Sequence, residues 1–185
     1  MFASTHPRTL IVNFNAPELN QLAAALAADD ALAAFVRPYV NKGRGWERAL
    51  AALPLAGGLY QSTFGRRRIG DARLAALTRE AGVLPDLCAA TVGRLAALLP
   101  GLRRHWASRL HMAVREAVAR AACRHVPGVE CVVAYEGFAL PAFERARALG
   151  GRVTALNYPV AHHRQRRRVR LEENEREPEF AVTWP

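Results

Sequence analysis

The sequence predicts an α/β domain in which a doubly wound parallel sheet of the Rossmann type carries helices on both faces. Two observations support this prediction. A short apolar, β-prone run at residues 8–13 is followed by apolar positions at helical spacing between Leu19 and Leu26. A strand, helix, strand and helix then follow one another from residue 131 onward, and such a right-handed crossover unit makes its two strands parallel.

The first half of the chain is expected to contain the opening strand and several helices. Asn15 is the expected N-cap of the first helix, with Glu18 three residues later as in a capping box. Residues 32–40 look extended and enter a glycine-containing loop. The other expected segments are a helix at 46–53, an irregular basic insertion at 57–71, and helices with apolar faces at 84–98 and 106–121.

The third quarter of the chain carries the clearest pattern. Residues 131–135 and 153–157 have the composition of buried strands, and the helix between them has Pro141 in its first turn and Gly150-Gly151 as its stop. A charged helix is expected to start near Val160. Ligands of such sheets bind outside the carboxyl ends of the strands, which here are residues 13–15, 136–138 and 157–159.

Composition limits the class of protein. The 185 residues are 51% hydrophobic, which suits one soluble domain with a substantial core. No apolar stretch reaches the roughly 18 residues of a membrane helix, and the first ten residues lack the pattern of a signal peptide, so a cytoplasmic protein is expected. Cys88, Cys123 and Cys131 have no metal-binding spacing and are expected to be reduced core residues.

The chain is strongly basic, with a formal net charge of +10 and Lys42 as its only lysine. Such a charge permits nucleic acid, anionic lipid or phosphorylated ligands as partners. Nucleic acid is not expected, because few aromatic residues accompany the arginines and no helix-turn-helix or RNA-recognition signature occurs.

Several kinds of chemistry have no counterpart in the sequence. It contains no serine nucleophile elbow, no Walker-type phosphate loop and no HExxH motif. The first turn, which includes Asn13 and Asn15, lacks the glycines of a dinucleotide fingerprint, so NAD and FAD are not expected. We therefore predict no cofactor and no metal site.

Basic residues gather where the last helix is expected to start. His162, His163 and Arg164 are followed by further arginines, although positive side chains near a helix N-terminus oppose the helix dipole. Exposed N–H groups together with basic side chains would form an anion site there. The alternative is that these arginines pair with the glutamates of 172–177 along a solvated helix, and that the histidines are structural.

Two other charged features also have two interpretations. Glu136, at a strand end, is a candidate acid, base or hydroxyl-binding group, or else an exposed turn residue. The run of three arginines at residues 66–68 would contact phosphate, lipid headgroups or RNA, or else is simply solvated.

These residues together resemble a known family. Residues 132–143 (VVAYEGFALPAF), a helix ending in Leu149-Gly150, and residues 156–162 (LNYPVAH) with a glutamate pair at 172–173 are similar to the acceptor-side domain of bacterial family 4 glycosyltransferases. In that family a strand, a helix ending in glycine, another strand and a small-Ala-His helix start occur in this order. The resemblance covers most of the chain and is specific between about Val132 and Trp184.

The resemblance implies one half of a GT-B glycosyltransferase, a retaining enzyme that transfers a sugar from a nucleotide donor to an acceptor in the cleft between two Rossmann-like domains. His162 would be the catalytic residue at that cleft. The implied partners are a nucleotide sugar, a sugar or lipid-linked acceptor and, peripherally, the inner face of an anionic membrane. The residues expected to bind substrate are Asn13, Asn15, Glu136, Gly137, Asn157, His163 and Arg164.

The expected domain organisation follows from the same resemblance. Residues 1–178 would form the Rossmann-like N-terminal domain, and residues 179–185, with Phe180 and Trp184, an exit segment towards a nucleotide-sugar domain that these residues do not include. Activity of this domain alone is therefore not expected. The alternative is a non-catalytic basic α/β module that docks on an anionic membrane or a protein partner.

Overall fold

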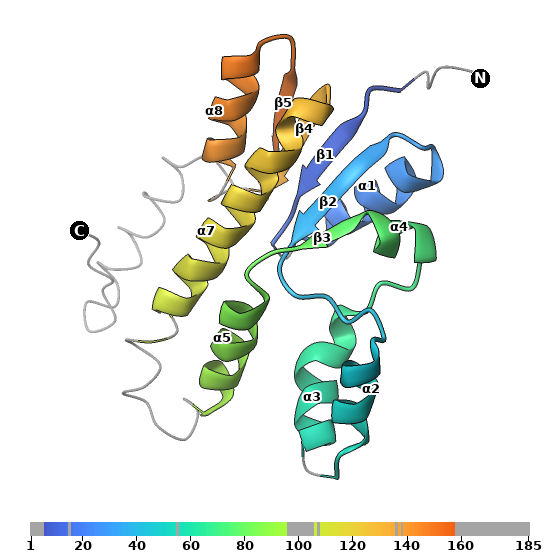
Figure 1. Ribbon diagram of the computed structural model, residues 1–185, viewed down its shortest axis with the longest axis vertical. Coiled ribbons are helices and arrows are strands. Elements are labelled where there is room, and N and C mark those ends of the chain that lie inside the picture. The colour runs from blue at the N-terminus through green and yellow to red at the C-terminus, as the bar shows by residue number, and fades with distance from the viewer. Residues whose placement is uncertain are drawn as a thin grey trace, which may run out of the picture.

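A five-stranded parallel sheet forms the centre of the protein (Figure 1). The computed structural model describes residues 6–14, 16–54, 56–95, 106, 108–135, 137 and 139–157. The strand order is β3-β2-β1-β4-β5 and every pairing is parallel. The strands are β1 (Thr9–Val12), β2 (Leu32–Arg37), β3 (Thr78–Glu80), β4 (Cys131–Tyr135) and β5 (Val153–Asn157). The prediction of a doubly wound parallel sheet is confirmed.

The register of the sheet places the predicted strands side by side. Val12 is aligned with Val36 of β2 and with Ala134 of β4, and Tyr135 is aligned with Asn157 of β5. The chain therefore builds the sheet outward from β1 to β3 and then crosses to the other side of β1. This reversal between β1 and β4 is the topological switch point, where open α/β sheets bind their ligands.

Helices cover both faces of the sheet (Figure 1). Helices α7 and α8 pack on the face that contains Leu10 and Val12, whereas α1 and α4 pack on the face that contains Ile11. The alternation follows from the two-residue repeat of a strand. The helices are α1 (Pro17–Ala28), α2 (Gly45–Ala52), α3 (Ala56–Phe64), α4 (Ala72–Leu77), α5 (Val83–Leu95), α7 (Ser108–His125) and α8 (Leu140–Leu149), with 3-10 turns at Gly65–Arg67 and Val126–Gly128.

A small aromatic cluster lies beyond the carboxyl edge of the sheet. Tyr39, Tyr60 and Phe64 are buried together, and helices α2, α3 and α5 surround them. The prediction that residues 57–71 are irregular is wrong, because most of this stretch forms α3 and a 3-10 turn, and Asp71 is the N-cap of α4. Tyr60 and Phe64 stand four residues apart on one helical face, so their burial against Tyr39 outweighs the low helix propensity of the neighbouring glycines.

The entry into α1 also differs from expectation. The N-cap is Ala16 rather than Asn15, and it has no side-chain cap. Asn13 instead accepts a hydrogen bond from the Ala16 N–H at 2.8 Å. Pro17 begins the helix, where its missing N–H costs nothing.

Burial corrects two further expectations. Strand β5 had been expected to be buried, but Val153 is 66% and Leu156 is 49% exposed, because among the described residues only β4 pairs with it. The cysteines are free thiols, yet Cys88 is exposed, so its predicted place in the core was wrong. Burial raises the pKa values of Cys123 and Cys131, which keeps these two thiols protonated.

The partly buried His125, at the end of α7, is expected to make stability depend on pH. Burial lowers its pKa below the ordinary 6.5, and Arg79 and Arg124 lower it further. The unfolded chain then binds more protons than the folded one near and below pH 6.5, so stability falls on acidification and returns as the pH rises. Urea unfolding between about pH 5 and pH 8 should show a steeper acid loss in the wild type than in His125→Asn. Parallel pH profiles would contradict this assignment.

Candidate functional site

The carboxyl edge of the sheet gathers several of the residues expected to form the site. Asn13 follows β1, Gly137 stands two residues after the end of β4, and Asn157 ends β5, so neighbouring strands deliver all three to one edge. The remaining candidates lie outside the described residues: Asn15, Glu136, His162, His163 and Arg164. The glutamates of 172–177 and the expected exit segment at 179–185 lie outside them as well.

Asn13 is fully buried and holds the turn that follows β1. Its side-chain amide donates to the Ala16 carbonyl at 2.8 Å and to the Asn20 Oδ1 at 2.9 Å, and its Oδ1 accepts from the Ala16 N–H. Because these bonds occupy its side-chain amide, Asn13 fixes the conformation of the turn at the edge of the site.

Asn20 connects Asn13 to Arg37, the last residue of β2, through hydrogen bonds. The Asn20 Oδ1 accepts from Asn13 and also from the Arg37 Nη1 at 3.1 Å. The Arg37 guanidinium also lies 5.4 Å from the ring centroid of Phe35, its neighbour on the same face of the strand. One guanidinium is thereby held in place at the carboxyl edge.

Arg37 is an unusual residue for a buried position. It is only 9% exposed, and its Nε is a buried donor that has no hydrogen-bond partner within the described part of the chain. Burial and the nearby Arg67 lower the pKa of Arg37 to about 10, while Asp86 opposes the shift, so the side chain remains charged at neutral pH. A buried donor without a partner costs about 1–3 kcal/mol, which calls for an explanation.

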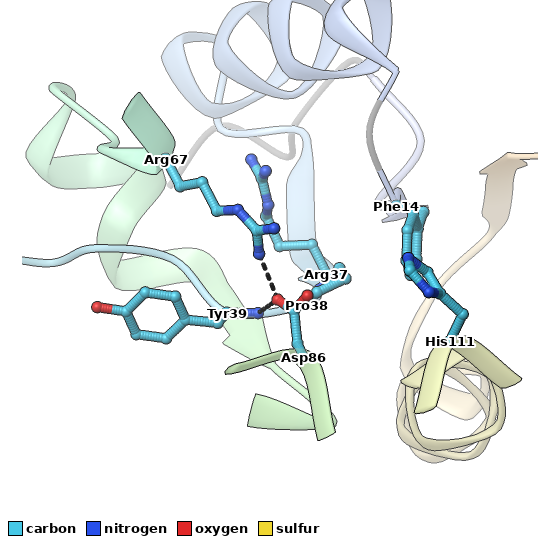
Figure 2. Close-up of a pocket in the computed structure, with 7 residues that line it drawn as sticks. All are labelled: Phe14, Arg37, Pro38, Tyr39, Arg67, Asp86 and His111. Carbon is cyan, nitrogen blue, oxygen red and sulfur yellow. Dashed lines mark hydrogen bonds and ion pairs between the residues drawn. The ribbon is translucent and has the colours of Figure 1, made fainter. Parts of the chain in front are cut away.

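A hollow of about 170 Å³ opens beside Arg37 (Figure 2). A water molecule needs only about 10–15 Å³ by the same measure, so the hollow has room for a small polar group. Its lining comes from the ends of β1 and β2, the 3-10 turn after α3, and helices α5 and α7. The lining residues are Phe14, Arg37, Pro38, Tyr39, Arg67, Asp86 and His111.

Two guanidinium groups and, among the described residues, one carboxylate line this hollow. Asp86, which is 5% exposed, forms an ion pair with Arg67 and accepts a hydrogen bond from the Tyr39 N–H at 3.1 Å. Figure 2 shows the Arg37 and Arg67 side chains beside one another, with Asp86 bonded to Arg67. The three side chains carry a combined charge of +1, and Arg37 has no carboxylate of its own among the described residues.

Helix α7 brings further basic side chains to the switch point. The His111 ring lies 6.3 Å from the Phe14 ring, at an angle of 42°. One turn later, the Arg115 Cζ lies 3.7 Å from where a Cβ on Gly137 would be. Gly137 has φ +96°, a conformation that favours glycine, and the guanidinium lies at ordinary contact distance from this turn.

Asn157 lies on the α1 side of the same edge. Its side-chain amide donates to the Glu18 Oε1 at 3.1 Å, and Glu18 stands in the first turn of α1. An acidic residue at this position also interacts favourably with the positive end of the helix dipole. The bond ties β5 to the start of the first helix across two strands.

Sequence reasoning missed most of the residues that line the hollow. Arg37 could have been identified from the sequence, because it stands within an apolar β-strand run and a charged residue is seldom buried unless it is paired. The arginine run at 66–68 was noted, but only the structure shows that Arg67 pairs with Asp86 while Arg68 is exposed. Asp86 and His111 stand in helices whose sequences give no hint of a shared site.

The described part of the chain contains no cluster of three or more His, Cys, Asp or Glu side chains that could hold a metal ion. Among the described helices, none has the length and apolar character needed to cross a membrane. No family model matches the sequence, and the searches of curated proteins and of solved structures found no significant match.

Proposed function

We propose that this chain is the acceptor-side domain of a family 4 glycosyltransferase of the GT-B architecture. The observation that carries the proposal is the parallel order β3-β2-β1-β4-β5, with its switch point between β1 and β4, at an edge that carries a basic hollow. The segment that resembles the family includes β4, α8 and β5, so its strand ends lie at this edge. Ligands of doubly wound sheets bind at such an edge.

In this proposal the edge forms one wall of a cleft, and the nucleotide sugar lies on a second domain that faces it. His162 would act on the transferred sugar from this side, and the residues at the strand ends would hold a sugar or lipid-linked acceptor. The protein would work in the cytoplasm, peripherally at the inner face of a membrane that supplies the acceptor. Transition-state stabilisation by a positioned side chain suits a cleft that closes around both substrates.

If donor and acceptor bind to different domains, the 185-residue chain alone should bind nucleotide sugars only weakly. Titration calorimetry with UDP- and GDP-sugars is expected to give dissociation constants above about 1 mM, because the donor's main contacts are on the other domain. Adding the second domain, joined to the chain or as a separate polypeptide, should produce sugar transfer from one of these donors to a saccharide or lipid-linked acceptor.

Two results would contradict the proposal. Micromolar binding of a nucleotide sugar by this chain alone would show that the donor binds to this domain and not to the second one. Absence of transfer from every donor, in a preparation that contains the second domain, would also count against a glycosyltransferase. If such a preparation instead bound anionic vesicles tightly, the non-catalytic membrane module would replace it.

A further inference from the structure

Among the described residues, the side chains that line the hollow beside Arg37 carry a net positive charge. Arg37 and Arg67 approach one another there, and Asp86 is the single carboxylate in the described part of the lining. Arg37 is buried and Arg67 is partly buried, so their guanidinium groups repel each other where less water is present to solvate them. An arrangement with this cost is expected where a negatively charged ligand completes it.

We propose that the hollow lined by Phe14, Arg37, Tyr39, Arg67, Asp86 and His111 binds the phosphate group of a phosphorylated acceptor. The identification of the ligand as an acceptor rests on the proposed function, whereas the phosphate site itself rests on the geometry. The Arg37 side chain is nine-tenths buried and lines the hollow, and it has no carboxylate partner of its own among the described residues.

The chemistry of the lining favours a phosphate over other small groups. A guanidinium presents donors in a planar fork that matches the oxygens of phosphate, and two such groups can contact different oxygens of one phosphate. A phosphate monoester carries a charge of about −1.5 to −2 at neutral pH. This negative charge is larger than the net charge of +1 on Arg37, Arg67 and Asp86, and the basic side chains of α7 lie close enough to add to it.

The site is organised before any ligand arrives. Asn20 holds the Arg37 guanidinium from one side, and Asp86 holds Arg67 from the other. Asp86 is itself anchored by the Tyr39 N–H. Because little side-chain entropy remains to be lost, binding needs few new contacts to be favourable.

The position of the hollow also orients the rest of the ligand. Arg37 and Arg67 lie on one side of it, and Phe14 and His111 lie on the opposite side, towards α7 (Figure 2). Beyond them, Arg115 and Gly137 mark the end of β4. A ligand whose phosphate contacts Arg37 would therefore extend past Phe14 towards the switch point between β1 and β4.

Titrations followed by nuclear magnetic resonance test the site in the full chain. The probes are inorganic phosphate and glycerol 1-phosphate, and the variants are Arg37→Gln, Arg67→Gln and Arg147→Gln. Arg147 is the matched control, because it is exposed and lies in the last turn of α8, at the amino edge of the sheet. We expect saturable binding at about 1–10 mM, weakened by about 10-fold or more in the first two variants and unchanged in the control.

Vesicles distinguish a lipid phosphate from a soluble one. Phosphatidylglycerol vesicles are compared with phosphatidylcholine vesicles, using the same three variants. Binding to phosphatidylglycerol that requires Arg37 and Arg67 would identify a lipid headgroup as the source, and binding of soluble phosphate alone would identify a soluble phosphoester. No saturable binding of any probe up to about 50 mM, or an equal loss in Arg147→Gln, would overturn the site.

The folded state of each variant is checked by circular dichroism. If Arg37→Gln does not fold, Arg67→Gln decides the question, since its side chain is only partly buried. Phosphate binding that depends on Arg67, without sugar transfer in the two-domain preparation, would keep the phosphate site and reject the glycosyltransferase. Sugar transfer at the wild-type rate in Arg67→Gln, together with no phosphate binding by the wild-type chain, would keep the glycosyltransferase and reject the phosphate site.

Discussion

Replacing Glu47 with alanine is expected to destabilise the protein by about 3–5 kcal/mol, the cost of breaking a buried charged network by removing one member. The Glu47 side chain is 1% exposed and accepts a hydrogen bond from the Tyr39 hydroxyl at 2.7 Å. It also accepts from the Arg44 N–H and lies 3.6 Å from the Arg44 guanidinium. Its removal deprives the Lys42 and Arg44 N–H groups of their acceptor next to the aromatic cluster, while the Tyr39 hydroxyl keeps its bond to Tyr60.

Urea unfolding followed by circular dichroism measures this effect. Glu47→Gln keeps one acceptor oxygen and is expected to cost less than the alanine variant. Glu116→Ala is the matched surface control: its carboxylate is 64% exposed and pairs with Arg120 one helical turn away at 3.6 Å, so its loss should cost less than about 0.5 kcal/mol. If Glu47→Ala stayed within about 1 kcal/mol of wild type, the network would not stabilise the fold as described.

The second large effect is on activity. In the proposed two-domain glycosyltransferase, His162→Ala is expected to lower kcat/KM by about 10-fold to 1000-fold, which corresponds to a transition-state hydrogen bond of about 1.4–4 kcal/mol. His162 lies outside the described residues, so this expectation rests on the family resemblance and on the strand end that precedes it. The proposal assigns His162 to the cleft and not to the core, so it also predicts that stability changes little.

The melting temperature and the transfer rate of the same variant decide between a catalytic and a structural histidine. A structural His162 would give a destabilised protein whose folded fraction remains fully active, which would end its assignment to the site. His6→Ala serves as the control for the substitution itself, since His6 is exposed near the start of the chain, and this variant should keep both its rate and its melting temperature.

Local pattern was enough to predict the second βαβ unit. The apolar runs at β4 and β5, Pro141 in the first turn of α8, and Gly150 after its end, with φ +66°, match the expected elements closely. The handedness of crossover connections then made these strands parallel without knowledge of the rest of the sheet. Each of these signals depends on residues a few positions apart, which is why it could be predicted.

The elements that were missed depend on contacts between distant segments. Strand β3 has three residues and exists because Phe35 to Arg37 of β2 offer it an edge to pair with. Helix α3 is held by the burial of Tyr60 and Phe64 against Tyr39, which precedes them by more than twenty positions. Propensity alone cannot report such packing.

The sequence by itself determined that the chain forms a parallel α/β sheet and that β1, β4 and β5 deliver their carboxyl ends to one edge, because periodicity and chain handedness are local properties. Only the tertiary structure decided which charged residues meet at that edge. Arg37, Arg67 and Asp86 come from β2, a 3-10 turn and α5, and their meeting depends on how the helices pack beyond the sheet. The interaction of two charges depends on the distance between them in space, and the number of residues between Arg67 and Asp86 does not fix that distance.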